Sequence, residues 1–212
     1  MRSILAVFAL MMSLVACADE QSPKAVYKEG THFAVLDNPV RTRNPNKIEV
    51  TEVFWYGCGH CFKFEPMVHQ WEKQQAEDVD FQQSPAMWNG AMEIHARAYY
   101  VSKALGVLDL THQPMFNALN LQRKPLNNVD QLGAFFAELG VDSDKFQKAY
   151  KSFGVNSQVK QADARARSYK ITGTPEIVVD GKYRVSARMA GGQAEMLKVV
   201  DYLVAKIRAE KG

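Results

Sequence analysis

The residues of this chain best suited to chemistry are two cysteines separated by two residues, Cys58 and Cys61. Thiols at this spacing can close a small disulfide ring across one helical turn, and such a ring opens when a thiolate attacks one of its sulfur atoms. A structural zinc site would usually need a second pair of Cys or His ligands. The histidines outside this motif are scattered along the chain, at His32, His69, His95 and His112. The pattern therefore predicts a redox-active dithiol that uses no metal or organic cofactor.

The elements on either side would place the first cysteine in a setting that activates it. Residues 48–56 are mostly apolar and β-prone, which is typical of a buried strand, and residues 62–75 have helical spacing. Cys58 would then lie where the strand leads into the helix, at the positive end of the helix dipole, which favours a thiolate. We expect His60 to stabilise this thiolate through an N–H group or a positive charge. Cys61 would be the more buried, resolving thiol.

The N-terminal segment indicates export from the cytoplasm. Residues 1–18 have a short basic start followed by about twelve mainly apolar residues, which is typical of a secretory signal. Two cleavage sites fit this segment. Cleavage after Ala18 would discard Cys17, whereas the residues before Cys17 also resemble a bacterial lipobox, in which Cys17 becomes the acylated first residue. Either way, the mature protein keeps no free thiol other than those of Cys58 and Cys61, in an oxidising compartment.

Composition excludes several other classes of function. The 212 residues carry a formal net charge of +3, which is too small to indicate binding to nucleic acid or to a membrane surface through a basic patch. Hydrophobic residues make up 47% of the chain and charged residues 23%, an ordinary globular balance. The length suits one large domain or a domain with an insertion.

The periodicity predicts an α/β domain interrupted by helices. Expected strands cover residues 31–36, 48–56, 80–85, 176–179 and 183–185, and expected helices cover residues 62–75, 91–106, 109–121, 128–140, 143–153, 156–169 and 193–209. Asp180-Gly181 between the last two strands is a strong hairpin signal, so we expect a mixed sheet with helices on both faces. Residues 19–90 and 156–212 would form the α/β domain, and residues 91–155 a helical insertion.

Two motifs resemble those of the bacterial DsbA family of periplasmic thiol–disulfide oxidoreductases. The first is Phe54-Trp55-Tyr56-Gly57-Cys58-Gly59-His60-Cys61-Phe62-Lys63-Phe64-Glu65-Pro66. The second is Ile171-Thr172-Gly173-Thr174-Pro175-Glu176-Ile177-Val178-Val179-Asp180-Gly181-Lys182-Tyr183. With a helical block between the third strand and the hairpin, the resemblance covers essentially all of residues 25–210. It implies a thioredoxin-like fold with a mixed sheet and an inserted all-helical subdomain.

The resemblance also implies roles for four further residues. The Thr174–Pro175 peptide bond would be cis and lie beside the dithiol, where the backbone of Thr174 could pair with an extended substrate chain. Glu52 would be a buried acid beneath the dithiol and Glu65 an acid near the helix start, both able to tune the thiol pKa. The residues alone leave alternatives: Glu52 could face outward, Glu65 could be a solvated charge, and the Thr-Pro bond could be trans.

The activity that the resemblance implies is the introduction of disulfides into exported proteins with free thiols. The protein would be a periplasmic monomer, soluble or tethered by lipid at Cys17, and would be re-oxidised by a DsbB-like membrane partner. Three departures from the family pattern leave the redox direction open: Gly59-His60 between the cysteines, Thr174 before the proline, and Gln83 where a basic residue is usual. A periplasmic isomerase or reductase is therefore one alternative. A substrate-binding chaperone or adaptor with an idle dithiol is another.

Overall fold

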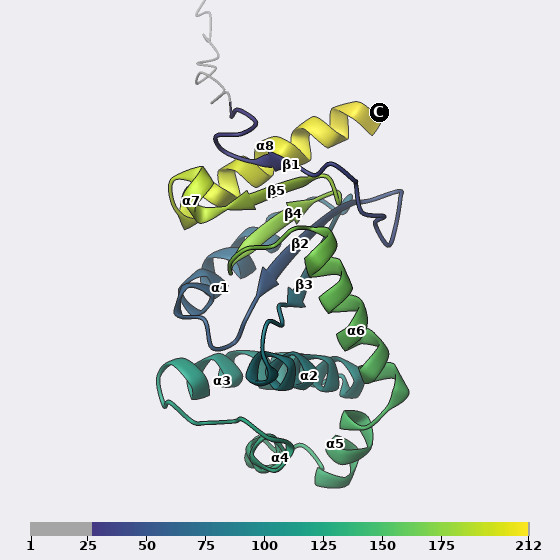
Figure 1. Ribbon diagram of the computed structural model, residues 1–212, viewed down its shortest axis with the longest axis vertical. Helices are drawn as coiled ribbons and strands as arrows, with labels where there is room; N and C mark the ends of the chain where they lie inside the picture. Colours follow the sequence, from purple (N-terminus) through teal and green to yellow (C-terminus); the bar gives the residue numbers. More distant parts are fainter. Residues whose placement is uncertain (1–26, 212) are drawn as a thin grey trace, which may run out of the picture.

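The structure, a computed structural model, describes residues 27–211, so the leader and Cys17 lie outside the described residues. At its centre is a five-stranded sheet in the order β1-β5-β4-β2-β3 (Figure 1). The strands are β1 Ala34–Val35, β2 Ile48–Phe54, β3 Val79–Pro85, β4 Glu176–Val179 and β5 Tyr183–Ser186. Strand β2 pairs in parallel with β3 and antiparallel with β4, which confirms the expected mixed sheet.

The central strand β2 leads directly to the dithiol. All of its residues are buried, because strands pair on both of its sides and helices cover both faces of the sheet. It ends at Phe54, slightly earlier than expected. The edge strand β1 is much shorter than the expected 31–36, because residues 28–33 are folded into turns in which Gly30 donates a hydrogen bond to Phe33.

The helices form two groups around the sheet (Figure 1). They are α1 Gly59–Glu72, α2 Gly90–Leu105, α3 Leu108–Asn120, α4 Val129–Glu138, α5 Ser143–Tyr150, α6 Phe153–Ser168, α7 Ala187–Ala190 and α8 Gln193–Lys211. Helices α1 and α8 pack on the sheet face that carries Val50 and Ile177, and the end of α6 packs on the face that carries Val53 and Val178. Within residues 27–211, no helix combines the length and the apolar character needed to cross a membrane.

The hairpin between β4 and β5 forms as the sequence predicts. Asp180 and Gly181 both have positive φ angles, 50° and 63°, and the N–H of Lys182 donates to the carbonyl of Val179 across them, which closes a tight turn within the three-residue connection between the paired Val179 and Tyr183. Gly181 is also pressed against the loop before β2, because a Cβ atom there would lie 1.9 Å from the carbonyl oxygen of Val40. Glycine at this position therefore serves both the turn and the packing of the loop.

Helix α1 begins and ends three residues earlier than the expected 62–75, and the boundary predicted between α5 and α6 is wrong. We expected Gly154 to end the helix over residues 143–153, but α5 ends at Tyr150 and Gly154 lies in the first turn of α6. The reason is that the side chain of Ser152 accepts a hydrogen bond from the backbone N–H of Val155, at 3.2 Å, and so caps α6. A favourable cap outweighs one glycine in a first turn.

Helices α2 to α5 gather on one side of the sheet, around a second hydrophobic core (Figure 1). Its large buried side chains include Phe116, Phe136 and Phe146. The same cluster continues into Tyr56 and Cys61, so the helical core reaches the dithiol itself. Helix α6 then returns the chain to the sheet, in contact with both α2 and β3. The division of the chain into residues 19–90, 91–155 and 156–212 stays a prediction.

Candidate active site

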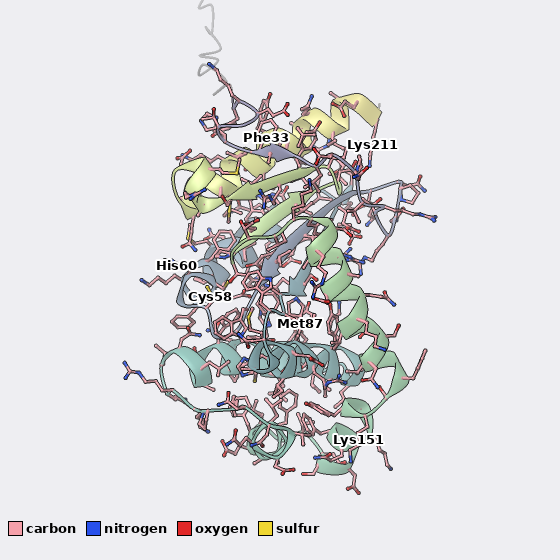
Figure 2. All side chains as sticks on the ribbon, in the orientation of Figure 1. Phe33, Cys58, His60, Met87, Lys151 and Lys211 are labelled. Atoms are coloured by element: carbon pink, nitrogen blue, oxygen red, sulfur yellow. The ribbon has the colours of Figure 1, made fainter. Side chains whose placement is uncertain are left out.

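The dithiol lies at the start of helix α1. Cys58 is the N-cap residue, with an extended backbone (φ −87°, ψ 114°), and the helix begins at Gly59. The Cys58 side chain is half-buried, whereas Cys61, one turn later, is fully buried. Figure 2 shows Cys58 and His60 at one edge of the molecule, where the sheet meets helices α2 and α3. The predicted junction of strand and helix is confirmed, as is the greater burial of Cys61.

The two thiols ionise very differently. A hydrogen bond with the side chain of Cys61 is the largest cause that lowers the pKa of Cys58 to about 5. Partial burial opposes this shift, while the side chain of Thr174 and the backbone amides of Cys61 and His60 favour the thiolate. Burial raises the pKa of Cys61 far above its usual range, and its hydrogen bond with Cys58 adds to the rise. Cys58 therefore ionises first, and Cys61 holds its proton.

His60 contributes to this arrangement through its backbone. Its side chain is exposed, and none of the hydrogen bonds in residues 27–211 joins its imidazole to Cys58. Its backbone carbonyl accepts a hydrogen bond of 2.7 Å from the side chain of Gln193, at the start of α8. Stabilisation of the thiolate by the imidazole stays a prediction.

The loop with Thr174 and Pro175 lies beside the dithiol. The peptide bond between these residues is cis, as the resemblance implies. The carbonyl oxygen of Thr174 lies 3.3 Å from the sulfur of Cys58, at hydrogen-bonding distance from the thiol. A groove of about 690 Å³ runs along this loop, and its walls include His60, Met189 and Gln193.

Glu52 lies below the dithiol and is completely buried. Its Oε2 accepts a hydrogen bond of 2.9 Å from the amide of Gln83, and its Oε1 has no hydrogen-bond partner among the described residues. Burial raises the pKa of Glu52 to about 8, and the charge of Glu65 raises it further. The charge of Glu52 in turn contributes to the raised pKa of Cys61, so the two side chains interact. The outward orientation that the sequence left open is excluded.

Glu65 is also buried, with 8% of its surface exposed, so it is not a solvated charge. The same amide of Gln83 that serves Glu52 donates to Glu65 Oε2 at 3.0 Å. The other oxygen, Oε1, lies 3.1 Å from Nε2 of His112. Gln83, which replaces the expected basic residue, thus bridges the two carboxyl groups.

Helix α3 supplies two contacts that the sequence analysis missed. The amide of Asn120 donates to the backbone carbonyl of Tyr56 at 2.7 Å, and the ring nitrogen Nδ1 of His112 lies 2.7 Å from the hydroxyl of Tyr56. Both residues fix the segment that leads into Cys58. No local motif marks them, because they lie 64 and 56 positions from Tyr56 and only the fold brings them there.

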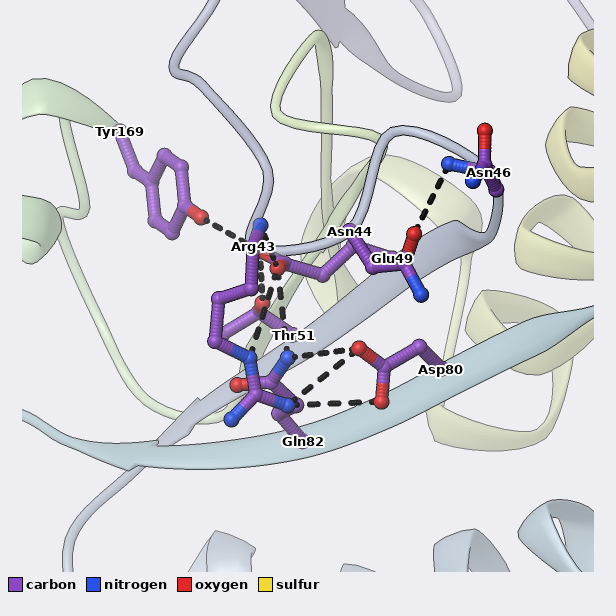
Figure 3. A network of polar contacts seen from close by, with 8 residues as sticks. All are labelled: Arg43, Asn44, Asn46, Glu49, Thr51, Asp80, Gln82 and Tyr169. Atoms are coloured by element: carbon purple, nitrogen blue, oxygen red, sulfur yellow. Dashed lines mark hydrogen bonds and ion pairs between the residues drawn. The ribbon is translucent and has the colours of Figure 1, made fainter.

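Strand β2 carries a second buried glutamate, Glu49, which Figure 3 shows within a network of polar contacts. Glu49 is 2% exposed. Its Oε1 lies 3.2 Å from the hydroxyl of Thr51 and 3.4 Å from that of Tyr169. Its Oε2 accepts from the backbone N–H of Arg43 at 3.0 Å and from the amide of Gln82 at 3.2 Å. The Arg43 guanidinium is 3.8 Å away, so this carboxylate is paired on every side.

The arrangement is suited to thiol–disulfide exchange. Cys58 can attack, or leave from, a sulfur atom as a thiolate, and Cys61 can resolve a mixed disulfide once it loses its proton. Within residues 27–211, no three His, Cys, Asp or Glu side chains are grouped as metal ligands would be.

Comparison with known proteins gives consistent matches. The family model for a DSBA-like thioredoxin domain matches residues 49–204. The thiol:disulfide interchange protein DsbA of Pseudomonas aeruginosa is 37% identical over 201 residues, covering 95% of this chain and 92% of that protein. The protein of the same name from Azotobacter vinelandii is 39% identical over 199 residues, covering 94% and 92%.

Solved structures agree with these matches. The crystal structure of Pseudomonas aeruginosa DsbA has a TM-score of 0.84 at 39% identity, covering 87% of this chain and 96% of that one. The oxidoreductase NmDsbA1 from Neisseria meningitidis has a TM-score of 0.77 at 27% identity, covering 87% and 95%. These matches confirm the predicted fold and class of reaction: this chain belongs to the DsbA-like thioredoxin domain family and is a thiol–disulfide oxidoreductase.

Proposed function

We propose that the protein oxidises pairs of thiols in exported proteins as they fold in the periplasm. The observation that carries the proposal is the unequal acidity of the two thiols. Because the pKa of Cys58 is about 5, Cys58 is a thiolate in the reduced enzyme at neutral pH, and the interactions that favour the thiolate stabilise the reduced form. A disulfide whose reduced form is stable is a strong oxidant. A thiolate of low pKa is also a good leaving group when the substrate is released.

The reaction would proceed in two exchanges. A substrate thiolate attacks the sulfur of Cys58, the Cys58–Cys61 bond breaks, and Cys61 leaves as a thiolate that takes up a proton. Glu52, protonated below about pH 8, can supply this proton. A second substrate thiolate then attacks the substrate sulfur of the mixed disulfide. Cys58 leaves as a thiolate, so two electrons pass from the substrate to the Cys58/Cys61 dithiol.

The groove beside Thr174 is the proposed substrate site. An extended chain can pair with the backbone of Thr174 while its sulfur reaches Cys58, since that backbone carbonyl already lies 3.3 Å from the Cys58 sulfur. The neighbouring side chains of Met189 and His60 would contact the residues that flank the substrate cysteine.

The same proposal covers the redox partner of the enzyme, its oligomeric state and its location in the cell. We infer that a DsbB-like membrane oxidase restores the disulfide and that the protein works as a monomer, either soluble in the periplasm or held to a membrane by lipid at Cys17. A reductase or isomerase is the second candidate. The observation that favours it is the Glu52–Glu65 pair, which Gln83 bridges without neutralising, because negative charge near the dithiol disfavours the Cys58 thiolate.

The decisive experiment combines a redox titration with an oxidation assay. Purified protein is equilibrated in glutathione buffers, and its oxidation of a reduced peptide with two cysteines is followed. We expect a potential more oxidising than about −180 mV and rapid oxidation of the peptide. A potential below about −230 mV would instead support the reductase.

Single cysteine variants test the residue roles. We expect Cys58→Ser to be inactive and Cys61→Ser to accumulate a mixed disulfide with the peptide. If Cys58→Ser keeps full biological activity, the dithiol is idle and the chaperone or adaptor alternative is correct.

A further inference from the structure

His112 on helix α3 lies in a fixed position between two polar groups of the active site. Its Nε2 is 3.1 Å from Glu65 Oε1, and its Nδ1 is 2.7 Å from the hydroxyl of Tyr56. The rings of Phe54, Tyr99 and Phe116 surround it, with centroids 5.2 to 6.0 Å away. Only 12% of its side chain is exposed. The ring therefore has little freedom to turn away from either partner.

The direction of each hydrogen bond follows from the chemistry of the partners. A neutral imidazole carries its proton on one nitrogen only, so a ring that accepts from Tyr56 at Nδ1 donates from Nε2 to Glu65. Burial raises the pKa of Tyr56 well above its usual value, so its hydroxyl keeps its proton and can donate to Nδ1. On the far side of Glu65, the amide of Gln83 uses one hydrogen for Glu65 and the other for Glu52.

The two buried carboxyl groups thus receive unequal numbers of hydrogen bonds. Glu65 receives one donor on each oxygen, from Gln83 and His112, and its side chain is 11% exposed. Glu52 receives one donor on Oε2, has no partner on Oε1 among the described residues, and has no exposed surface. Of two neighbouring carboxyl groups, the one that accepts more hydrogen bonds and is more exposed to water ionises at the lower cost in free energy.

We propose that His112 is a positioning residue that keeps the negative charge of this pair on Glu65 and the proton on Glu52. The consequence for catalysis rests on the function proposed above. A protonated Glu52 can give its proton to Cys61 as Cys61 leaves, and it places no charge beside the Cys58 thiolate. Gln83 serves both carboxyls equally, so His112 is the contact that makes them differ.

Several titratable and charged side chains lie near His112. Glu65 from α1, Tyr56 from the segment after β2, and Tyr99 from α2 face the ring. The groove of about 690 Å³ on this side of α1 also holds the charged or titratable side chains of Arg43, His69, Glu72, Lys103 and Asp109. The Nζ of Lys103 lies over the ring of Tyr99, 5.7 Å from the ring centroid.

The test follows both carboxyl groups directly. Protein labelled with ¹³C at the glutamate carboxyl carbons is titrated by NMR in its oxidised form, in which neither thiol ionises, and the two signals are assigned with Glu52→Gln and Glu65→Gln. In His112→Phe, which keeps an aromatic ring in the same setting, Glu65 loses a donor. We expect Glu65 to bind its proton more tightly and Glu52 to bind its proton about tenfold more weakly.

Two further variants separate the two contacts of the ring. His112→Gln can keep an N–H donor near the position of Nε2, so we expect it to titrate as the wild type does. His112→Asn can keep an acceptor near Nδ1 for Tyr56 but loses the donor to Glu65, so we expect it to behave as His112→Phe does. His69→Gln is the matched control, because His69 lines the same groove but pairs with the exposed Glu72.

The pH at which Glu52 titrates decides between the outcomes. If Glu52 titrates at the same pH in the wild type and in His112→Phe, or if His112→Gln and His112→Asn give the same result, the inference is wrong. If His112→Phe does not fold, the comparison of Gln with Asn decides. The carboxyl titration is independent of the oxidation assay. A wild type that fails to oxidise the peptide would therefore overturn the proposed function and leave the role of His112 to be judged by NMR.

Discussion

Two glutamates on the strand β2, Glu49 and Glu52, are equally buried but are held in opposite ways. Successive side chains on a strand alternate between faces, so the two point to opposite sides of the sheet. Glu49 receives hydrogen bonds on both oxygens and lies near a guanidinium group (Figure 3). Glu52 receives one hydrogen bond, on one oxygen, and the negative charge of Glu65 raises its pKa further.

The difference shows that burial alone does not mark a functional carboxyl group. A buried charge with a full set of donors acts as a fixed structural anion, here one that holds the loop before β2 to the sheet. A buried carboxyl that lacks donors is more stable with a proton and can exchange that proton during a reaction. The surrounding donors, and not the strand position, separate the two roles.

Replacing Glu49 should produce the largest change in stability. Glu49→Leu leaves the hydroxyls of Thr51 and Tyr169, the amide of Gln82 and the N–H of Arg43 without their acceptor. We expect the free energy of unfolding to fall by about 4 kcal/mol, measured by urea denaturation, while the potential of the dithiol is unchanged. Glu49→Gln, which keeps one acceptor oxygen, should lose less. A shift in potential without loss of stability would contradict the structural role.

Replacing Glu52 should have the opposite effect. The folded-state pKa of Glu52, about 8, is above its unfolded value of about 4.3. The folded carboxyl binds its proton more tightly, so its contribution to stability is complete below about pH 4.3 and is lost as the pH rises to about 8. Glu52→Gln does not titrate and escapes this loss. We expect it to be more stable than the wild type by about 2 kcal/mol at pH 8, after the cost of one unpaired amide N–H.

The measurement is urea denaturation of the oxidised protein at a series of pH values. The stability of Glu52→Gln relative to the wild type should increase from about pH 4.3 to about pH 8, and at lower pH the variant should be the less stable of the two, because only the cost of its unpaired amide N–H is left. A second expected effect is slower resolution of mixed disulfides by Cys61, since the variant has no carboxyl to exchange a proton. The comparison of the two glutamates fails if Glu52→Gln is destabilised as much as Glu49→Gln.

Local rules were enough to predict the frame of the site. The dithiol at a helix start and the Asp180-Gly181 turn each depend on a few neighbouring residues, and both form as expected. The face of Glu52 could not be predicted, because every residue of β2 is buried and no alternation marks an outer face. The boundary of α6 was wrong because the cap of Ser152 outweighs a glycine.

Contacts from distant helices could not be found in the sequence. His112 and Asn120 reach the dithiol segment only because α3 packs against α1, and nothing near them in the chain distinguishes His112 from the exposed His69. The partners of Glu49 come from the loop before β2, from β3 and from the residue after α6, so their convergence is also a property of the fold. The charge balance of a buried site therefore needs three-dimensional neighbours.

The smallest expected effect is on the pKa of Cys58, from a change at Thr174. The side chain of Thr174 is one of the groups that lower the pKa of Cys58. Thr174→Val keeps the shape of the side chain and removes its hydroxyl, so we expect the pKa of Cys58 to rise by about 1, which is a cost of about 1.4 kcal/mol to the thiolate. Thiolate absorbance against pH in the reduced protein measures this directly.

Thr172→Val is the matched control for Thr174→Val, because the Thr172 hydroxyl bonds to Glu176 at 3.0 Å and not to Cys58. Glu49→Gln should also leave the Cys58 titration unchanged. If Thr174→Val and Thr172→Val titrate alike, the loop does not supply a donor to the thiolate, and the low pKa depends on Cys61 and the helix start alone.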